Sequence, residues 1–354
     1  MTVGPIPPAL NPCCNRSLLA WSQALRKAIR RRDFIKIIAG SATVWPLAAR
    51  AQQAKIAQIG FLSSATAAGY AKKFEALQAG LRSFGYLEGK NIVIHSRWAE
   101  GNYNQLAALA SELIALKVDV LVTHGTPAAS ALKKATATIP IVMAVSGDAD
   151  KTGLIQSLAR PGGTVTGLTY FTAEQASKRL ELMKEVIPSI NRVALLANPG
   201  NPADLQLELL AMEGAVRALK ITYKTFEVRD PAELDNVFST IAKGNIDMVQ
   251  IAQDGMLVGN FARIATLALK EHSPAIGEAN FADEGGLIGF GPDTTEMFRR
   301  AAYYVDRLIK GEKAADLPVE RPTKYELNIN LKTAKALGIS VPGTMLTRAD
   351  NVIE

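Results

Sequence analysis

The sequence predicts an α/β protein made of two doubly wound, Rossmann-like lobes that are joined by crossovers. From residue 55 onward, β-compatible apolar runs alternate with amphipathic helical segments, an order typical of parallel sheets with helices on both faces. The alternation starts again near residue 173, and residues 52–354 have the length of two domains of ordinary size. Two rounds of alternation therefore predict two lobes.

The first round supplies the elements of the first lobe. Leu106, Leu109, Leu113 and Leu116 recur on one face of a helical segment. The short apolar runs between such segments predict buried strands. The predicted strands are residues 55–62, 91–96, 119–123, 139–145 and 165–170, and the predicted helices are 67–84, 104–116 and a short one from Pro127.

The second round has the same order. Leu180, Met183 and Ile187 form the apolar face of its first helix. The predicted strands are residues 192–197, 221–228, 247–251 and 274–277, and the predicted helices are 173–186, 203–219, 232–242 and 261–271.

The C-terminal part is too short for a third domain. It holds a predicted helix at 294–308, the segment 324–330 and a helix at 331–337. We expect these elements to cross back and complete the lobes, which assigns 55–169 and 290–321 to lobe 1 and 170–289 and 322–354 to lobe 2. The hinges are then expected near Thr169-Tyr170, Gly289-Phe290 and Arg321-Pro322.

The N-terminal segment predicts export. Residues 30–36 read RRRDFIK, an apolar stretch follows to Ala49, and Ala49-Arg50-Ala51 is a small-x-small cleavage pattern. The paired arginines favour the Tat route. The apolar stretch is shorter than the roughly 20 residues that span a bilayer, and Pro46 interrupts it. We therefore interpret residues 1–51 as a Tat-type signal peptide with an extended n-region, and we expect a periplasmic protein.

The leader also accounts for the net positive charge of the sequence and for both of its cysteines. Residues 1–51 hold eight of the 40 basic and one of the 33 acidic residues, which leaves 32 of each sign in residues 52–354. The expected mature chain is formally neutral, so the excess positive charge does not argue for nucleic acid as a partner. Cys13 and Cys14 both lie in the leader, so no disulfide or thiol chemistry is expected after it.

Several stretches resemble one family in order along the chain. They read GYLEGKNIVI at 85–94, RWAEG at 97–101, GTPAA at 125–129, IPIV at 139–142, GLIQSLARPGG at 153–163, KRLEL at 178–182 and PVERPTKYELNINLKTAKALG at 318–338. Together they resemble the ABC-transporter substrate-binding proteins of the tryptophan/tyrosine-type group.

The resemblance implies a type I periplasmic binding protein, a two-lobed monomer that carries a small solute, often an amino acid, to the permease of an ABC importer. The same scaffold also serves as a sensory module that presents its closed form to a receptor kinase. Neighbouring genes for a permease or for a kinase distinguish these two roles.

Ligands of open α/β sheets lie beyond the carboxyl ends of strands, against helix N-termini. Loops at these positions hold the candidate ligand-binding residues. In the first lobe these are Ser63, Ser64, Thr66, His124, Gly125, Thr126, Ser146, Gly147 and Asp148, and in the second lobe they are Asn198, Asn201, Asp254, Glu278 and Phe281.

The two sets of loops differ in chemistry. Gly and small hydroxyl residues in the first set present N–H and O–H groups to a carboxylate, while Asp254 and Glu278 in the second set can hold an ammonium. This combination favours an amino acid or a related carboxylate. The loops lack the paired aromatics of a sugar site and the arginines of a polyanion site.

Each candidate also has a purely structural interpretation. Ser63, Ser64, Thr66 and Thr126 are residue types that cap helices, and Thr126 precedes a Pro at the first helical position. The same interpretation makes His124 a buried or rim histidine, Asp148 a cap or hinge residue, Asp254 a cap or turn residue, Asn198 and Asn201 turn formers, and Phe281 a core residue. Ala149 stands where the family usually has Pro, so the resemblance supports a ligand-binding role for Asp148 less strongly.

The sequence favours a binding protein over an enzyme. His95, His124 and His272 are scattered without metal-ligand spacing. Nucleophile-elbow, dinucleotide-binding and phosphate-loop motifs are missing from the sequence. An Asp254–Glu278 pair is the remaining acid–base candidate. We expect no catalytic residue, no metal and no cofactor.

Overall fold

A five-stranded parallel sheet, in the order β2-β1-β3-β4-β5, is the first of two sheets in the computed structural model. The structure describes residues 56–354, so the predicted leader lies outside it. The central strands β3 and β4 are buried along their whole length because helices cover both faces. The strands are β1 (Ala57–Ser63), β2 (Ile92–Trp98), β3 (Val120–His124), β4 (Ile141–Val145) and β5 (Val165–Gly167).

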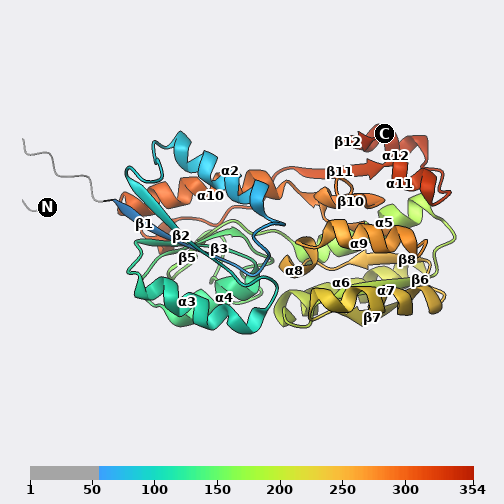
Figure 1. Ribbon diagram of the computed structural model, residues 1–354, viewed down its shortest axis with the longest axis horizontal. Helices are drawn as coiled ribbons and strands as arrows, with labels where there is room; N and C mark the ends of the chain where they lie inside the picture. The colour runs from blue at the N-terminus through green and yellow to red at the C-terminus, as the bar shows by residue number, and fades with distance from the viewer. Residues whose placement is uncertain (1–55) are drawn as a thin grey trace, which may run out of the picture. The chain divides into compact units, whose positions relative to one another are not determined.

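Two helices cover each face of this sheet (Figure 1). Alternate residues of β1 divide between the two cores, because successive strand residues point to opposite faces. Phe61 packs against Phe298 of α10, with ring centroids 6.4 Å apart, while Leu62 joins Leu113 of α3. The elements are α2 (Ala71–Ser83) and α10 (Thr294–Ile309) on one face, α3 (Leu106–Ala115) and α4 (Thr126–Ala135) on the other, and the 3₁₀ turns η1 (Tyr103–Gln105) and η4 (Ala314–Asp316).

The second sheet has seven strands in the order β12-β11-β10-β9-β8-β6-β7. All of its neighbours are parallel except β10 and β11, which run antiparallel. The strands are β6 (Arg192–Ala197), β7 (Thr222–Glu227), β8 (Met248–Ile251), β9 (Ala275–Gly277), β10 (Ile288–Pro292), β11 (Tyr325–Asn330) and β12 (Asn351–Ile353).

Helices also flank the second sheet, with α5 packed on α6 and α7 packed on α9. Its helical elements are α5 (Thr172–Val186), α6 (Pro202–Leu219), α7 (Leu234–Lys243), α8 (Gly255–Val258), α9 (Phe261–Lys270), α11 (Leu331–Ala336), α12 (Gly343–Arg348) and the 3₁₀ turns η2 (Pro231–Glu233) and η3 (Ala279–Phe281). We call each sheet with its helices a lobe. The predicted α/β class with two lobes is confirmed.

The structure departs from the prediction mainly after residue 250. The short elements α8, α12 and β12 were not predicted, because three to six residues carry too little periodicity to identify. Gly289 and Phe290, expected near a hinge, lie inside strand β10. The strand expected at 165–170 ends at Gly167, and Tyr170 forms a separate bridge with Gly147.

Ile56–Glu354 forms one compact unit, within which the chain passes between the two sheets three times. Two of these crossovers are hydrogen-bonded to each other. The amide of Thr169 donates to the carbonyl of Glu320 at 3.0 Å, and the amide of Glu320 donates to the carbonyl of Gly167 at 3.0 Å. The Glu320 carboxylate in turn accepts two hydrogen bonds, of 2.9 and 2.7 Å, from Arg300 on α10.

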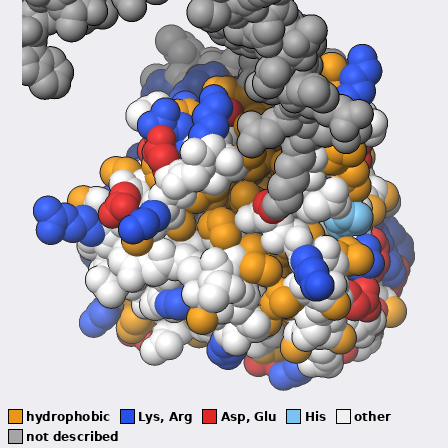
Figure 2. Space-filling model, turned by 90° about the vertical axis from the view of Figure 1, so that its left-hand side faces the viewer, with side chains coloured by type: hydrophobic (Ala, Val, Ile, Leu, Met, Phe, Trp, Pro, Cys, Tyr) orange, Lys and Arg blue, Asp and Glu red, His pale blue; other side chains and the backbone are white. Residues whose placement is uncertain are grey.

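The surface at the end of the molecule drawn in Figure 2 mixes basic, acidic and hydrophobic side chains. Over residues 56–354, every helix is too short or too polar to cross a membrane.

Candidate binding site at the junction of the two lobes

Three loops at the carboxyl ends of first-lobe strands are tied together by side-chain hydrogen bonds. Ser63 Oγ lies 3.1 Å from His124 Nδ1, which joins the loops after β1 and β3. Thr126 Oγ1 lies 3.2 Å from Ser146 Oγ and accepts a 3.2 Å hydrogen bond from the amide of Gly147, which joins the loops after β3 and β4. The first-lobe candidates thus form one continuous surface of hydroxyl and backbone groups.

Gly125 allows the loops after β1 and β3 to approach closely. Its φ of 89° lies in the left-handed region, which favours glycine. A Cβ at this position would lie 2.5 Å from Ser64 Oγ. Gly125 is also the N-cap residue of α4, with a proline in the first turn, so the helix begins with its amide end at this surface.

His124 is buried, in agreement with its structural interpretation. Its ring centroid lies 4.2 Å from that of Tyr70 and 5.6 Å from that of Phe298. Burial, with a smaller effect of nearby Lys73, lowers the pKa of His124 to about 3. The imidazole is therefore neutral at physiological pH and a weak base beside the Ser63 hydroxyl.

Asp148 lies in the loop after β4, where the first lobe meets α5. Its carboxylate accepts a 2.9 Å hydrogen bond from the amide of Thr172 and lies 3.2 Å from the ammonium of Lys151. Its backbone has a φ of 30°. Asp148 therefore caps α5 at the first crossover, as one of its two interpretations predicted.

The second-lobe candidates after β6 and β8 also bond to one another. Asn198 Nδ2 donates to Asp254 Oδ1 at 3.1 Å, and Asn198 Oδ1 accepts from the amide of Gly200 at 2.8 Å. Asn201 Nδ2 donates to Asp204 Oδ2 at 2.9 Å. Asn198 and Asn201 thus orient buried carboxylates as well as the turn before α6.

Asp254 has both of its carboxylate oxygens engaged. Oδ1 accepts hydrogen bonds from the amides of Met256 and Leu257 at 3.0 and 3.3 Å, so Asp254 caps α8. Oδ2 accepts a 2.7 Å hydrogen bond from the hydroxyl of Tyr103 in the first lobe. Burial raises the pKa of Asp254, and these donors oppose that shift.

The lobes touch closely beside Asp254. A Cβ on Gly255 would lie 2.7 Å from Ser64 Oγ, and a Cβ on Gly69 would lie 2.6 Å from the carbonyl oxygen of Gly259. The Oγ1 of Thr66, a half-buried residue, would lie 3.1 Å from a Cβ on Gly259. We call the region where these loops of the two lobes meet the junction.

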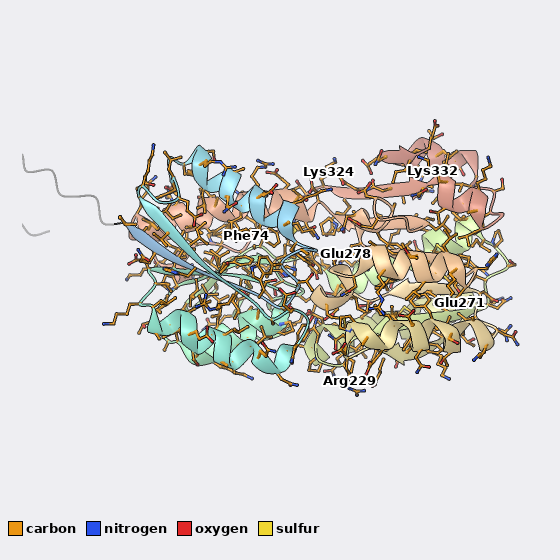
Figure 3. All side chains as sticks on the ribbon, in the orientation of Figure 1. Phe74, Arg229, Glu271, Glu278, Lys324 and Lys332 are labelled. Atoms are coloured by element: carbon orange, nitrogen blue, oxygen red, sulfur yellow. The ribbon has the colours of Figure 1, made fainter. Side chains whose placement is uncertain are left out.

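Glu278 and Phe281 follow β9, but they have different surroundings. Glu278 is 6% exposed and lies at the border between the lobes (Figure 3). Among residues 56–354, nothing forms a hydrogen bond or an ion pair with its carboxylate. Phe281 is fully buried and packs edge to face on Phe261, with centroids 4.9 Å apart. The structure therefore places Phe281 in the core of the second lobe.

The structure adds polar residues that were not among the candidates predicted from the loops after the strands. They come from helices or crossovers rather than from the ends of strands. The buried ones are Tyr70, Lys73, Tyr170, Gln175, Arg179, Asp204 and Glu208, and Tyr103 is half-buried. Asp204 and Glu208 share their buried helix face with Met212, and this four-residue spacing is the signal that could have identified them.

Burial raises the pKa of both α6 carboxylic acids. The pKa of Asp204 rises to about 6 and that of Glu208 to about 7, because burial disfavours the charged form. Arg179 opposes the shift of Glu208, and its own pKa is lowered by burial. Acidic and basic groups are therefore both buried at the junction.

Several of these groups have polar atoms without a hydrogen-bond partner in the described protein. They include Lys73 Nζ, Thr172 Oγ1, Arg179 Nη1, Asp204 Oδ1 and Glu208 Oε1. Leaving a buried donor or acceptor unsatisfied costs about 1–3 kcal/mol. A small solute that carries both donors and acceptors can satisfy such groups, so the chemistry that this arrangement supports is polar recognition.

A pocket of about 520 Å³ opens at the edge of the junction. Its walls come from both lobes and include Tyr103, Asn198 and Arg229. Arg229 is labelled in Figure 3. Since Tyr103 and Asn198 are also the partners of Asp254, the pocket reaches the hydrogen bond that links the lobes.

Comparisons with known proteins identify the family and the fold. The family model described as "ABC transporter substrate binding protein" matches residues 55–353. A tyrosine-binding protein of Clostridioides difficile (strain R20291) is 26% identical over 260 residues, which cover 73% of this chain and 74% of that protein.

Solved structures show the same architecture. An ABC domain of Streptococcus pneumoniae in complex with L-Trp is 25% identical, with a TM-score of 0.77 over 84% of this chain and 99% of that one. A conserved domain protein of Vibrio cholerae O1 biovar El Tor is 27% identical, with a TM-score of 0.78 over 84% of this chain and 100% of that one.

Proposed function

The chain belongs to the ABC transporter substrate-binding protein family, and from this premise we propose that it is the periplasmic solute-binding component of an ABC importer. The proposed solute is an amino acid or a related carboxylate, bound at the junction. Tryptophan and tyrosine, which name two of the relatives, are amino acids and support this ligand class.

One observation carries the choice of ligand class. Acidic and basic side chains from the two lobes are buried together, and several of their polar atoms have no partner among residues 56–354. An amino acid offers an anion and a cation a few bonds apart, which matches buried groups of both signs.

We assign the two ends of the solute to different lobes. The carboxylate binds the hydroxyl and amide groups of the first-lobe loops, from Ser63, Ser64 and Thr66 through Gly125 and Thr126 to Ser146 and Gly147. The ammonium binds Glu278, since its carboxylate has no protein partner in the described chain. The remaining candidates support this site, with His124, Asp148, Asn198, Asn201 and Asp254 orienting the loops and Phe281 packing behind Glu278.

Binding is coupled to closure of the lobes in this proposal. The solute contacts one lobe, and the lobes close by bending at the crossovers near residues 169–170 and 321–322 and at the crossover between the end of β10 and the start of α10. The expected boundary at residues 289–290 moves to the end of β10, so the lobes comprise residues 56–169 with 293–321 and residues 170–292 with 322–354. The permease subunits then recognise the closed form of a monomer.

We also propose export by the Tat route, with residues 1–51 as the signal. The protein acts by binding and carries out no reaction of its own. Within the described chain, the pair that most resembles a catalytic dyad is Ser63 with His124, and the lowered pKa of His124 argues against a role as a base.

A thermal-shift screen tests the ligand class. Amino acids, urea-type amides, sugars and carboxylates are added to the purified protein, and a ligand that binds only the folded state raises the melting temperature by mass action. We expect amino acids or related carboxylates to raise it. A rise with a sugar and no change with any amino acid or carboxylate would contradict the proposed ligand.

A further inference from the structure

Lys73 on α2 is a buried lysine at the junction. It is 5% exposed, although Lys72 beside it is exposed to solvent. Its ammonium lies 4.4 Å from the centroid of the Tyr70 ring, which in turn packs at a tilt of 43° against His124 at the carboxyl end of β3. Phe74, the next residue along the same helix, is labelled in Figure 3. Lys73 therefore extends from α2 toward the first-lobe loops.

The ammonium of Lys73 has no hydrogen-bond partner among the described residues. The carboxylates that act on it are those of Glu278, Glu284 and Asp293, with Glu278 the strongest. None of the three approaches within the 4.0 Å of an ion pair. Burial lowers the pKa of Lys73, as expected for a cation removed from water without a direct partner.

The other first-lobe cations close to the candidate residues have partners, since Lys151 lies 3.2 Å from Asp148 Oδ1 and Arg321 lies over the Phe171 ring. In the described chain, the basic residues that are buried are Lys73 and Arg179. Arg179 belongs to the second lobe and is held there, because its Nε donates to the carbonyl of Phe290 at 2.9 Å. His124 is neutral at physiological pH. Lys73 is thus the cation that the first lobe offers to a solute.

Packing alone does not explain a lysine at this position. A methionine would occupy similar space on α2 without a buried charge, and the Tyr70 ring attracts the ammonium but accepts no N–H···O hydrogen bond from it. An anionic group of the solute, placed between Lys73 and the first-lobe loops, would supply the missing partner.

We propose that Lys73 determines specificity by binding a second anionic group of the solute, so that the preferred solutes are acidic amino acids and small dicarboxylates. The inference rests on the proposed function, because it assumes a solute whose first carboxylate binds the hydroxyl-rich loops and whose ammonium binds Glu278.

Calorimetric titration of the full chain with three matched probes tests the proposal. L-glutamate carries the second anion, L-norvaline has a side chain of similar length without it, and glutarate carries both carboxylates without the ammonium. We expect L-glutamate to bind at least about tenfold more tightly than L-norvaline, the lower bound for one charge-assisted hydrogen bond.

Three variants separate the charge from the fold. Lys73→Met should weaken L-glutamate binding about 10- to 100-fold and leave L-norvaline binding unchanged, and Lys73→Arg should retain part of the preference. Lys72→Met, on the exposed neighbour, should leave both affinities as in the wild type. The melting temperature without ligand reports whether each variant is folded.

The outcomes distinguish this inference from the proposed function. If L-norvaline or L-tyrosine binds as tightly as L-glutamate, or if Lys73→Met keeps the preference, the role of Lys73 is wrong and the amino-acid function stands. If glutarate binds in a Lys73-dependent manner and no amino acid binds, the anion role of Lys73 stands, the solute is a carboxylate, and the assignment of an ammonium to Glu278 is wrong. If none of the probes binds, both are wrong.

Discussion

The hydroxyl of Tyr103, in the first lobe, donates a 2.7 Å hydrogen bond to Oδ2 of Asp254, in the second lobe. The same hydroxyl oxygen accepts a 3.1 Å hydrogen bond from the amide of Met256, so Tyr103 bonds to both the cap and the first turn of α8. The Tyr103 hydroxyl and the Asp254 carboxylate can form this hydrogen bond only while the lobes are in contact. This pair therefore favours the closed arrangement of the junction.

Replacement of Tyr103 by phenylalanine should open the lobes more often. Tyr103→Phe removes both hydrogen bonds and keeps the ring, and a hydrogen bond to a charged group contributes about 1.5–3 kcal/mol. We expect the affinity for a confirmed solute to fall about tenfold, with little change in fold. Titration calorimetry measures the affinity, and small-angle scattering measures the opening. Tyr223→Phe, on the edge strand β7, is the matched control, and equal affinities of the two variants would contradict a role of Tyr103 in closure.

The charge of Glu278 should matter more than its size. Glu278→Gln keeps the shape of the side chain and removes the anion proposed to hold the ammonium, so we expect amino-acid binding to weaken about tenfold or more. Glu213→Gln changes an exposed glutamate on α6 and should have no effect. Titration of both variants with the same amino acid is the measurement. Wild-type affinity in Glu278→Gln would remove Glu278 from the site.

An added methyl group at Gly147 should hold the first-lobe loop away from α6. A Cβ there would lie 2.7 Å from Asp204 Oδ1 and 2.7 Å from Thr172 Oγ1. Overpacking of this kind costs about 1–3 kcal/mol. We expect Gly147→Ala to lower both the melting temperature and the affinity for solute. Gly163→Ala is the control, because its Cβ would meet no atom within 4 Å, and the same behaviour of both variants would argue against close contact at Gly147.

Glu208 should make the protein less stable as the pH rises. Burial raises its pKa to about 7 from an unfolded value of about 4.3. The folded chain then retains a proton that the unfolded chain has lost, so this contribution to stability is complete below pH about 4.3 and is lost as the pH rises through 7. Between pH 6 and 8 the loss amounts to about 1.4 kcal/mol, one pKa unit.

Comparison of variants isolates this contribution. Glu208→Gln cannot ionise and should show a flatter dependence of the unfolding free energy on pH, while Glu213→Gln, exposed on the same helix, should follow the wild type. His124 acts in the opposite sense near pH 6.5, because its pKa is lowered to about 3 in the folded chain. Denaturant titrations of all three proteins at pH 6 and 8 are therefore compared with one another. Parallel profiles would contradict an ionisable Glu208.

The sequence predicts the loops of the junction well, because a general rule places them. Ser63, Ser146 and Glu278 each lie at or just after the end of a strand, and the carboxyl ends of parallel strands meet at one edge of a sheet. The local bonding of these residues was not predictable. Asp254, for example, had equal reason to bind an ammonium or to cap a turn, and the position of Tyr103 determines that both of its oxygens have protein partners.

The helical contributors were missed for a different reason. Charged residues on a helix are usually solvated, so Lys73, Asp204 and Glu208 resemble surface residues in the sequence. The four-residue spacing of Asp204, Glu208 and Met212 marks one helix face, but the spacing alone does not show that this face is buried. Strand β10 was missed for a related reason, since Gly289 and Gly291 are rare in strands and its pairing partner, Asn328 on β11, lies far along the chain.

Helix α10 belongs to the first lobe, although most of the second lobe precedes this helix in the sequence. During synthesis, the aromatic side of the first sheet around Phe61 and Tyr70 therefore stays partly uncovered until Phe298 has left the ribosome. The first lobe therefore cannot complete its folding before the second lobe has been synthesised. Folding depends instead on contacts between distant parts of the chain, which form slowly and leave incomplete chains prone to aggregation.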